Sequence, residues 1–202
     1  MKKKLNKKVG VVGEITAKFH DQRTLTDKQK KKNAKLNTFR HLVIDRLPSA
    51  TLRRFFYKRF TNAYQLGELR EVKKRTNVIC NAGFSDITKR LTGDPIVDST
   101  GELNKALLGD GVGSASAADT TLINEVYRND IASGTDDENI AIFTVFFTEG
   151  EVTGTFTEFG NCIDGEAGAD TGLLWSHITG LNWVKDSSTA LVVSCKYTFA
   201  SA

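Results

Sequence analysis

Proline, methionine and cysteine are scarce in this chain, and long apolar runs are absent. Only two prolines, Pro48 and Pro95, occur in 202 residues, which excludes stiff proline-rich linkers. The three cysteines match no zinc or redox spacing, so buried reduced thiols are expected. No stretch reaches the roughly 18 apolar residues of a membrane span, and the first eight residues lack the apolar core of a secretion signal. We therefore expect a soluble protein, made in a cytoplasm, with no membrane partner.

Charge is divided unevenly along the chain. Residues 1–76 hold 22 Lys and Arg against 6 Asp and Glu, a net charge of +16, whereas residues 77–202 hold 6 against 18, a net charge of −12. The overall value of +4 hides this division. A basic segment joined to an acidic one indicates a part that contacts something anionic, or an acidic neighbour, and a part that folds by itself.

Two strand patterns flank a helical insertion in the basic part. Val9–His20 alternates apolar and polar side chains, which predicts a half-buried strand, and Gly67–Ile79 follows this period less regularly. Between them, Thr26 and Ser49 are candidate N-caps for two helices. We expect a basic helical hairpin at about residues 26–64. Its apolar residues fall at helical spacing, and its Phe residues are spaced like core residues: Leu36, Phe39, Leu42 and Val43, then Leu52, Phe55, Phe56, Phe60 and Tyr64.

The acidic part favours a mainly β fold. A short helix is expected at residues 83–92, ended by Gly93. Segments of strand type then alternate with short Gly, Asp and Ser turns, which favours an antiparallel, jelly-roll-like β-sandwich. We expect residues 1–8 to form a basic N-terminal arm and residues 9–202 one β-sandwich domain that carries the helical insertion. The expected strands in the acidic part are Asn139–Thr148, Val152–Ile163, Leu173–Ile178 and Ser188–Phe199.

The basic side chains admit four interpretations. They form a solvated face, a docking surface for acidic neighbours in an assembly, a nucleic-acid contact that neutralises phosphates, or an amphipathic helix on an anionic membrane. Charge alone does not decide among them. The candidate residues for docking or polyanion contact are Lys2, Lys3, Lys4, Lys7, Lys8, Lys30, Lys31, Lys32, Arg53, Arg54, Lys58 and Arg59.

Glycine spacing argues against a phosphate-binding enzyme. Gly109, Gly111 and Gly113 lie two residues apart but are not followed by the Gly-Lys-Ser/Thr of a P-loop. We expect a tight turn that needs positive φ instead. No serine, histidine and carboxylate set, and no paired carboxylates, indicate catalysis. The chain is therefore expected not to be an enzyme and to need no cofactor.

Two groups of charged residues outside the basic part have structural interpretations. Asp164, Glu166 and Asp170 crowd one turn, yet they lack the register of a calcium loop, so a solvated turn is expected and no metal site. Glu125 and Arg128 lie three residues apart and are expected to pair with each other. His177 is expected to be a partly buried strand residue.

The order of motifs in residues 77–202 resembles that of a family of small bacteriophage virion proteins found among tail, baseplate and fibre genes. Asn77–Phe84 contains an N-A-G helix start, and Ala106–Gly113 contains a G-x-G turn. Ala118–Arg128 has the pattern D-T-x-L-x-x-E-x-x-R, Gly154–Gly160 contains T-E-x-G, and Leu173–Ile178 follows. The first strand also fits the family, whereas the helical insertion replaces a short turn.

The resemblance implies a structural component of a bacteriophage virion, in the tail, baseplate or fibre attachment. Its implied partners are other virion proteins and copies of itself, bound through the basic arm and the hairpin. The alternative is a nucleic-acid-binding virion or capsid-associated protein that places its lysine-rich segments on phosphates.

Overall fold

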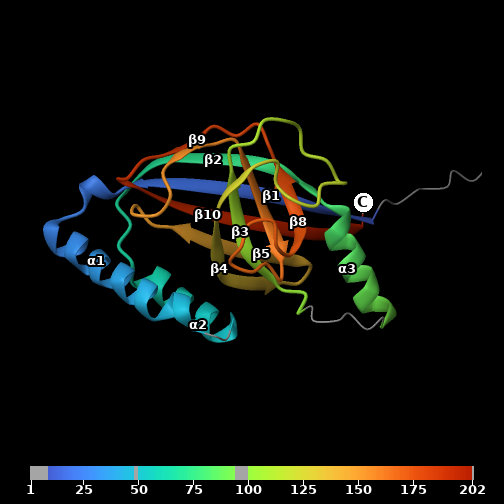
Figure 1. The fold of residues 1–202 in the computed structure, drawn as a ribbon, viewed down its shortest axis with the longest axis horizontal. Coiled ribbons are helices and arrows are strands. Elements are labelled where there is room, and N and C mark those ends of the chain that lie inside the picture. Colours follow the sequence, from blue (N-terminus) through green and yellow to red (C-terminus); the bar gives the residue numbers. More distant parts are fainter. Residues whose placement is uncertain (1–8, 48–49, 94–99, 202) are drawn as a thin grey trace, which may run out of the picture.

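The structure is a computed structural model that describes residues 9–47, 50–93 and 100–201, and it is mainly β (Figure 1). Eight antiparallel strands close into a barrel, and two more form a separate small sheet. In barrel order the eight are β1 (Val9–Asp21), β10 (Thr189–Ser201), β5 (Ile140–Phe147), β4 (Glu125–Asp137), β3 (Leu103–Gly109), β7 (Glu158–Ile163), β8 (Leu173–Ile178) and β2 (Glu68–Ile79). The small sheet pairs β6 (Gly154–Phe156) with β9 (Trp183–Lys185).

The expected β-sandwich is therefore wrong, because the sheet closes on itself. β2 pairs with β1 along most of its length and joins β8 through Val78 and Ile79. An alternating pattern predicts one buried face per strand, and a sandwich and a barrel need the same alternation. Only the long-range pairing of β2 with β8 distinguishes them, and no local pattern encodes it.

The barrel interior is filled by the alternating residues that the strand patterns predict. Ile15, Ala17 and Phe19 of β1 are buried, as are the odd-numbered residues of β10 from Leu191 to Tyr197. Phe199, expected on the same face, lies near the end of the strand and is 40% exposed. Trp183 packs against Phe19 and Phe159 in the centre.

The strands β3, β4 and β9 were not predicted, and one predicted strand corresponds to two strands in the structure. Val152–Ile163 contains both β6 and β7. β3 and β9 are short, and β4 lacks apolar alternation because its outer face lies against a helix instead of water. Asn129 and Asp130 of β4 pair there with arginines of the hairpin, so polar residues are buried where the period predicts exposure.

The helical insertion and the short helix are confirmed. α1 (Asp27–Leu42) has Thr26 as its N-cap, and the Thr26 side chain forms a capping box with Gln29. α2 (Ala50–Ala63) follows a 3-10 turn at Ile44–Arg46, and the expected N-cap Ser49 lies outside the described residues. α3 (Asn81–Thr92) ends at Gly93 with φ of 69°, in the left-handed region that favours glycine. No helix in the described ranges is long and apolar enough to cross a membrane.

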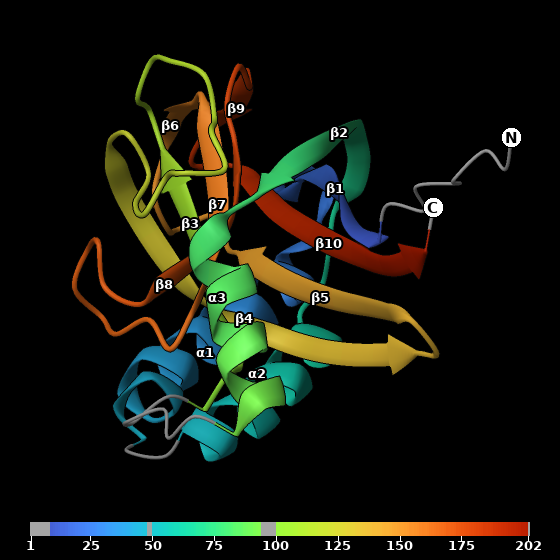
Figure 2. The same cartoon turned by 90° about the vertical axis from the view of Figure 1, so that its right-hand side faces the viewer.

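α1 and α2 lie side by side along one flank of the barrel (Figures 1 and 2). A second apolar cluster fills the space between them and the outer face of the wall. Phe60 of α2 and Tyr64, which follows its last residue, pack there against Phe146 of β5, and Tyr57 of α2 belongs to the same cluster. The hairpin is thus part of the packed structure.

Candidate docking surface

A buried arginine fixes the hairpin to the barrel. Arg40 of α1 is 2% exposed, and its guanidinium lies 2.5 Å from Glu151, which is also buried. It donates further hydrogen bonds of 2.8 Å to Tyr57 and to Asn129. Burial would lower the pKa of Arg40, but the charge of Glu151 reverses this effect and raises it. The Arg40 guanidinium of α1 thus contacts Tyr57 of α2 and Glu151 of the loop between β5 and β6 at once, and these contacts set the orientation of both helices on the barrel.

This orientation turns a stripe of α1 away from the barrel. Lys28, Lys32, Lys35, Phe39 and Leu42 follow one another at spacings of three or four residues and are all exposed. The stripe is basic in the first half of the helix and apolar in the second. Phe39 and Leu42 remain 44% and 57% exposed, contrary to the core spacing inferred for Phe39.

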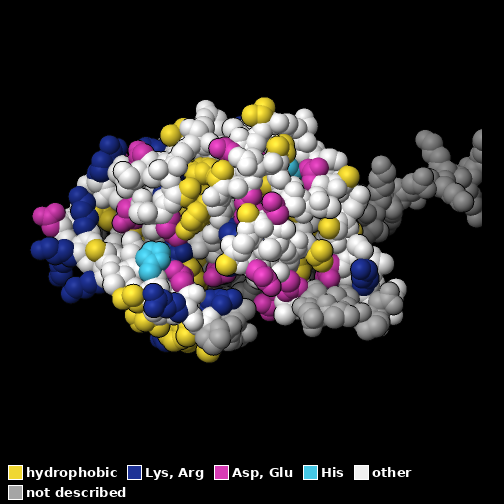
Figure 3. Space-filling model, in the orientation of Figure 1, with side chains coloured by type: hydrophobic (Ala, Val, Ile, Leu, Met, Phe, Trp, Pro, Cys, Tyr) yellow, Lys and Arg dark blue, Asp and Glu magenta, His cyan; other side chains and the backbone are white. Residues whose placement is uncertain are grey.

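α2 continues the same surface. Tyr57, Phe60 and Tyr64 face the barrel, so Leu52 and Phe55 point outward and are 48% and 53% exposed. Of the residues expected at core spacing in this helix, Phe60 is buried, whereas Leu52 and Phe55 are exposed because Tyr57 occupies the inner face. We call the combined surface the hairpin face; hydrophobic, Lys and Arg side chains gather over this end of the molecule in Figure 3. It comprises Lys28, Lys31, Lys32, Lys35, Phe39, Leu42, Val43, Leu52, Phe55, Lys58 and Arg59, all exposed.

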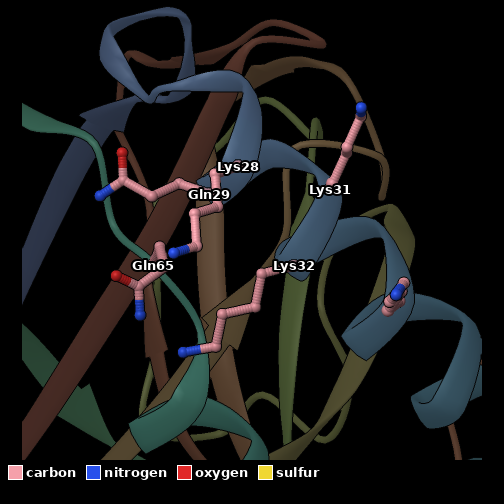
Figure 4. A pocket seen from close by; sticks show the side chains of 6 residues that line it. Lys28, Gln29, Lys31, Lys32 and Gln65 are labelled. Carbon is pink, nitrogen blue, oxygen red and sulfur yellow. The ribbon is translucent and has the colours of Figure 1, made fainter.

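The basic half of the hairpin face surrounds a cavity of about 690 Å³. Gln29 and Gln65 complete its lining, and we call it the basic cavity (Figure 4). The ammonium groups of Lys28 and Lys32 point toward Gln65, whereas Lys31 points away. None of its four lysines forms an ion pair with another residue in the described part of the chain. The cavity is therefore suited to an anionic group from outside.

The predicted contact residues do not all reach this surface. Lys31, Lys32, Lys58 and Arg59 lie on it, and Arg59 stacks over the Phe55 ring at 5.5 Å. Lys30 lines a different cavity, beside Gln22 and Arg23. Arg53 turns inward, donates to the Leu47 carbonyl at 2.7 Å and lies 3.8 Å from Asp130. Lys2, Lys3, Lys4, Lys7, Lys8 and the side chain of Arg54 lie outside what the structure describes.

Several residues of this surface were not predicted, although the sequence contains a signal for them. Lys28 and Lys35 share the helical spacing of Lys32 and continue into Phe39 and Leu42. A stripe that is basic at one end and apolar at the other does not face a core. Extending the helical period across the whole of α1 would have found it.

A second constellation, which we call the buried clamp, joins Asp119, Glu158 and His177. The imidazole of His177 lies 2.9 Å from Glu158 through Nε2 and 2.6 Å from Asp119 through Nδ1. Glu158 also accepts backbone N–H groups of Gly111, Ile123 and Asn124 at 2.7–3.0 Å. The clamp ties the loop between β3 and β4 to β7 and β8.

The carboxylates of the buried clamp are stabilised by groups of the fold itself. Burial would raise the pKa of Glu158, but the N–H groups of Asn124 and Ile123 and the His177 ring outweigh it and lower the pKa. The pKa of Asp119 is lowered similarly, against burial, by Ser116 and His177. The His177 ring thus lies between two carboxylates, with one ring nitrogen within hydrogen-bond distance of each. His177 and Glu158 are fully buried, not partly as expected for His177.

The clamp also explains the glycines of the G-x-G motif. The expected positive φ is wrong, since neither Gly109 nor Gly111 has one. A Cβ at either position would come within 2.4–2.6 Å of the Glu158 carboxylate, so close approach demands glycine. Gly83 of the N-A-G motif is constrained in the same way, with Trp175 2.3 Å from an added Cβ.

The expected pairing of Glu125 with Arg128 is confirmed as a two-point contact of 2.5 and 2.6 Å. Arg128 also donates to the Glu166 carbonyl and to Thr171, which fixes the loop between β7 and β8. Asp164 in that loop accepts a hydrogen bond from the Thr100 hydroxyl. Within residues 9–47, 50–93 and 100–201, no group of three or more His, Cys, Asp or Glu residues is placed to hold a metal ion.

The fold and these two constellations define a closed β-barrel protein that carries a rigidly attached, basic and apolar helical hairpin. No family model, no curated protein and no solved structure matches the chain.

Proposed function

We propose that the protein is a non-enzymatic structural subunit of a bacteriophage virion, in the tail, baseplate or fibre attachment, and that it docks onto neighbouring subunits through the hairpin face. The virion assignment comes from the motif order in residues 77–202. In this chain those motifs build the buried clamp, the Gly83–Trp175 contact and the Glu125–Arg128 pair. Their shared role is to fix loops on a barrel, which fits a structural protein.

The observation that carries the docking role is the exposure of large apolar side chains among unpaired cations. A solvated charged face does not need Phe39, Leu42, Leu52 and Phe55 on its surface. Fully burying one such side chain against a partner contributes about 1.5–3 kcal/mol. Several of them beside lysines give an apolar centre with a charged rim, the anatomy of a protein interface.

Rigid attachment supports the same role. Arg40, Tyr57 and Glu151 hold the hairpin in one orientation through a buried ion pair and short hydrogen bonds. A preorganised surface loses little entropy on binding. The non-enzymatic role is supported by the burial of the acid–base constellation around His177.

The test is incorporation of variants into particles of the phage that encodes the chain. Lys28→Glu/Lys32→Glu reverses charge on the hairpin face, and Lys18→Glu/Lys74→Glu makes the same change at exposed sites on the barrel. We expect the first variant to fold, by circular dichroism, yet to be missing from purified particles, while the control is incorporated. Absence of the wild-type protein from particles, or equal incorporation of both variants, would overturn the proposal.

Nucleic-acid binding is the second candidate, and the basic cavity favours it. Four lysines around one cavity can neutralise up to four phosphates, which gives a slope of about −3 to −4 in log K against log salt on duplex DNA. Titration of duplex DNA across a salt series measures this slope. No binding at about 50 mM salt would eliminate this candidate, because phosphate contacts strengthen as salt falls.

A further inference from the structure

β4 extends beyond its neighbour β3 and ends, together with β5, in an acidic turn. β3 pairs with β4 only as far as Asp130, so residues 133–137 of β4 pair with β5 alone. Figure 2 shows the two strands extending to one side, with the turn at their tip. Asp136, Asp137 and Glu138 stand there in succession, all exposed. We call these three residues the acidic turn.

The acidic turn has no cationic partner among residues 9–47, 50–93 and 100–201. Its three side chains make no ion pair or hydrogen bond with any residue that the structure describes. Other carboxylates of the acidic part behave differently: Glu151 pairs with Arg40, and Asp130 lies between Lys105 and Arg53. The acidic turn and the basic cavity are thus two groups of opposite charge left unpaired by the fold.

The two groups cannot meet in one molecule. α1 lies at one end of the structure, and the tip of β4 and β5 lies away from it in both views (Figures 1 and 2). The hairpin is held by the buried Arg40–Glu151 pair, so α1 cannot swing toward the tip without breaking it. Contact between the two groups therefore requires a second molecule.

We propose that the acidic turn of one copy docks into the basic cavity of the next, so that the protein assembles head to tail. The inference deepens the proposed docking role and rests on it, since it names a second copy of this chain as occupant of the basic half of the hairpin face. Three exposed carboxylates on one turn would meet a cavity of about 690 Å³ that four lysines line. The two surfaces differ, so the contact is heterologous and generates a ring or a filament.

Charge complementarity favours this occupant over an unrelated one. Like charges facing each other cost several kcal/mol, and opposite charges steer two copies into one register. The apolar half of the hairpin face, with Phe39 and Phe55, stays available for a different neighbour. One subunit could then join its own copies through the lysines and another protein through the apolar residues.

Charge reversal on each surface tests the proposal. The cavity variant is Lys28→Glu/Lys32→Glu/Lys35→Glu, and the turn variant is Asp136→Lys/Asp137→Lys/Glu138→Lys. All six positions are exposed, so both variants should keep the wild-type circular dichroism spectrum. In sedimentation velocity of nuclease-treated protein at low salt, we expect the wild type to self-associate and each variant alone to associate at least about tenfold more weakly.

Mixing the two variants supplies the decisive measurement. Each reversed surface then meets its complement on the other variant, so association is expected to return, and added salt should weaken it. A monomeric wild type, unchanged association of either variant, or a mixture that stays monomeric would overturn the inference. Larger aggregates of the turn variant alone would also overturn it, because the acids would then serve only to keep an exposed strand edge from pairing.

The outcome is separable from that of the proposed function. If self-association fails but Lys28→Glu/Lys32→Glu is still missing from particles, docking stands and the occupant is another virion protein. If the charge-reversal results hold but that variant enters particles normally, head-to-tail pairing stands and the docking role in particles is lost.

Discussion

Removing the charge of Arg40 tests how the hairpin is held. Arg40→Met keeps an unbranched side chain but leaves the buried carboxylate of Glu151 without the cation that now lies 2.5 Å away. It also removes the donors to Tyr57 and Asn129. Breaking a buried pair from one side costs about 3–5 kcal/mol, because the remaining charge is uncompensated. We expect that loss in the free energy of unfolding, which for a protein of this size lowers Tm by about 6–20 °C.

Urea denaturation measures the loss, and a double-mutant cycle assigns it. In the Glu151→Gln background, Arg40→Met should cost much less, since no buried anion remains, and the difference is the coupling energy. Hydrogen exchange should accelerate in α1 and α2 before the barrel strands. Arg46→Met, at an exposed position of the same hairpin, is the matched control, with an effect within about 0.5 kcal/mol. A loss below about 1 kcal/mol, or no coupling with Glu151, would refute the anchor.

Four further expectations concern titratable groups. The amide of His177→Gln can donate to only one of the two clamp carboxylates, because its oxygen only accepts, so urea unfolding should show a loss of about 1–3 kcal/mol. The pKa values of Asp119 and Glu158 are lowered in the folded state from their ordinary values of 3.8 and 4.5. These two carboxylates therefore stabilise the folded protein fully above their ordinary pKa values, and this contribution disappears as pH falls through the lowered values. Acid unfolding followed by fluorescence should show the loss. Burial lowers the pKa of Lys185 to about 8 from 10.5, so wild-type stability should gain from this group as pH rises between these values, and Lys185→Met should lack that gain in urea unfolding at several pH values. Burial raises the pKa of the three cysteine thiols to about 11–12, so a thiol reagent should label them only after unfolding, and rapid labelling of the native protein would contradict their burial.

Local patterns in the sequence were sufficient for the elements that obey one simple period. The alternation of Val9–His20 and the caps at Thr26 and Gly93 identify β1, α1 and the end of α3. The same alternation fits an open or a closed sheet, so the barrel could not be predicted. Its closure depends on pairing β2 with β8 across about a hundred residues of sequence, a contact that local periodicity does not contain.

The candidate surface was predicted less well than the fold, and for a different reason. A charged residue can be assigned to the surface from its type alone only when the fold offers it no partner of opposite charge. Arg53 was predicted to lie on the surface, but it is drawn inward by Asp130 of the barrel strand β4, 3.8 Å away. Phe39 was predicted to be buried because of its spacing, yet Arg40, the next residue, occupies the inner face of α1. In α1 the buried inner face therefore carries the cation Arg40 and the exposed outer face carries Phe39, which is the reverse of the usual assignment.

The anchor and the docking surface are consequences of the same division of charge. Arg40, Arg53 and Arg70 of the basic part reach Glu151, Asp130 and Asp186 of the acidic part, so three of its arginines hold the two parts together. Lysines form none of these contacts. A planar guanidinium matches a carboxylate and several acceptors at once, whereas a lysine ammonium is strongly hydrated and stays in water at lower cost. Arginines are therefore suited to attach the hairpin, and the four lysines of the basic cavity remain for a partner. If this division of roles holds, replacing those lysines by alanine should leave the stability of the protein nearly unchanged and remove its association.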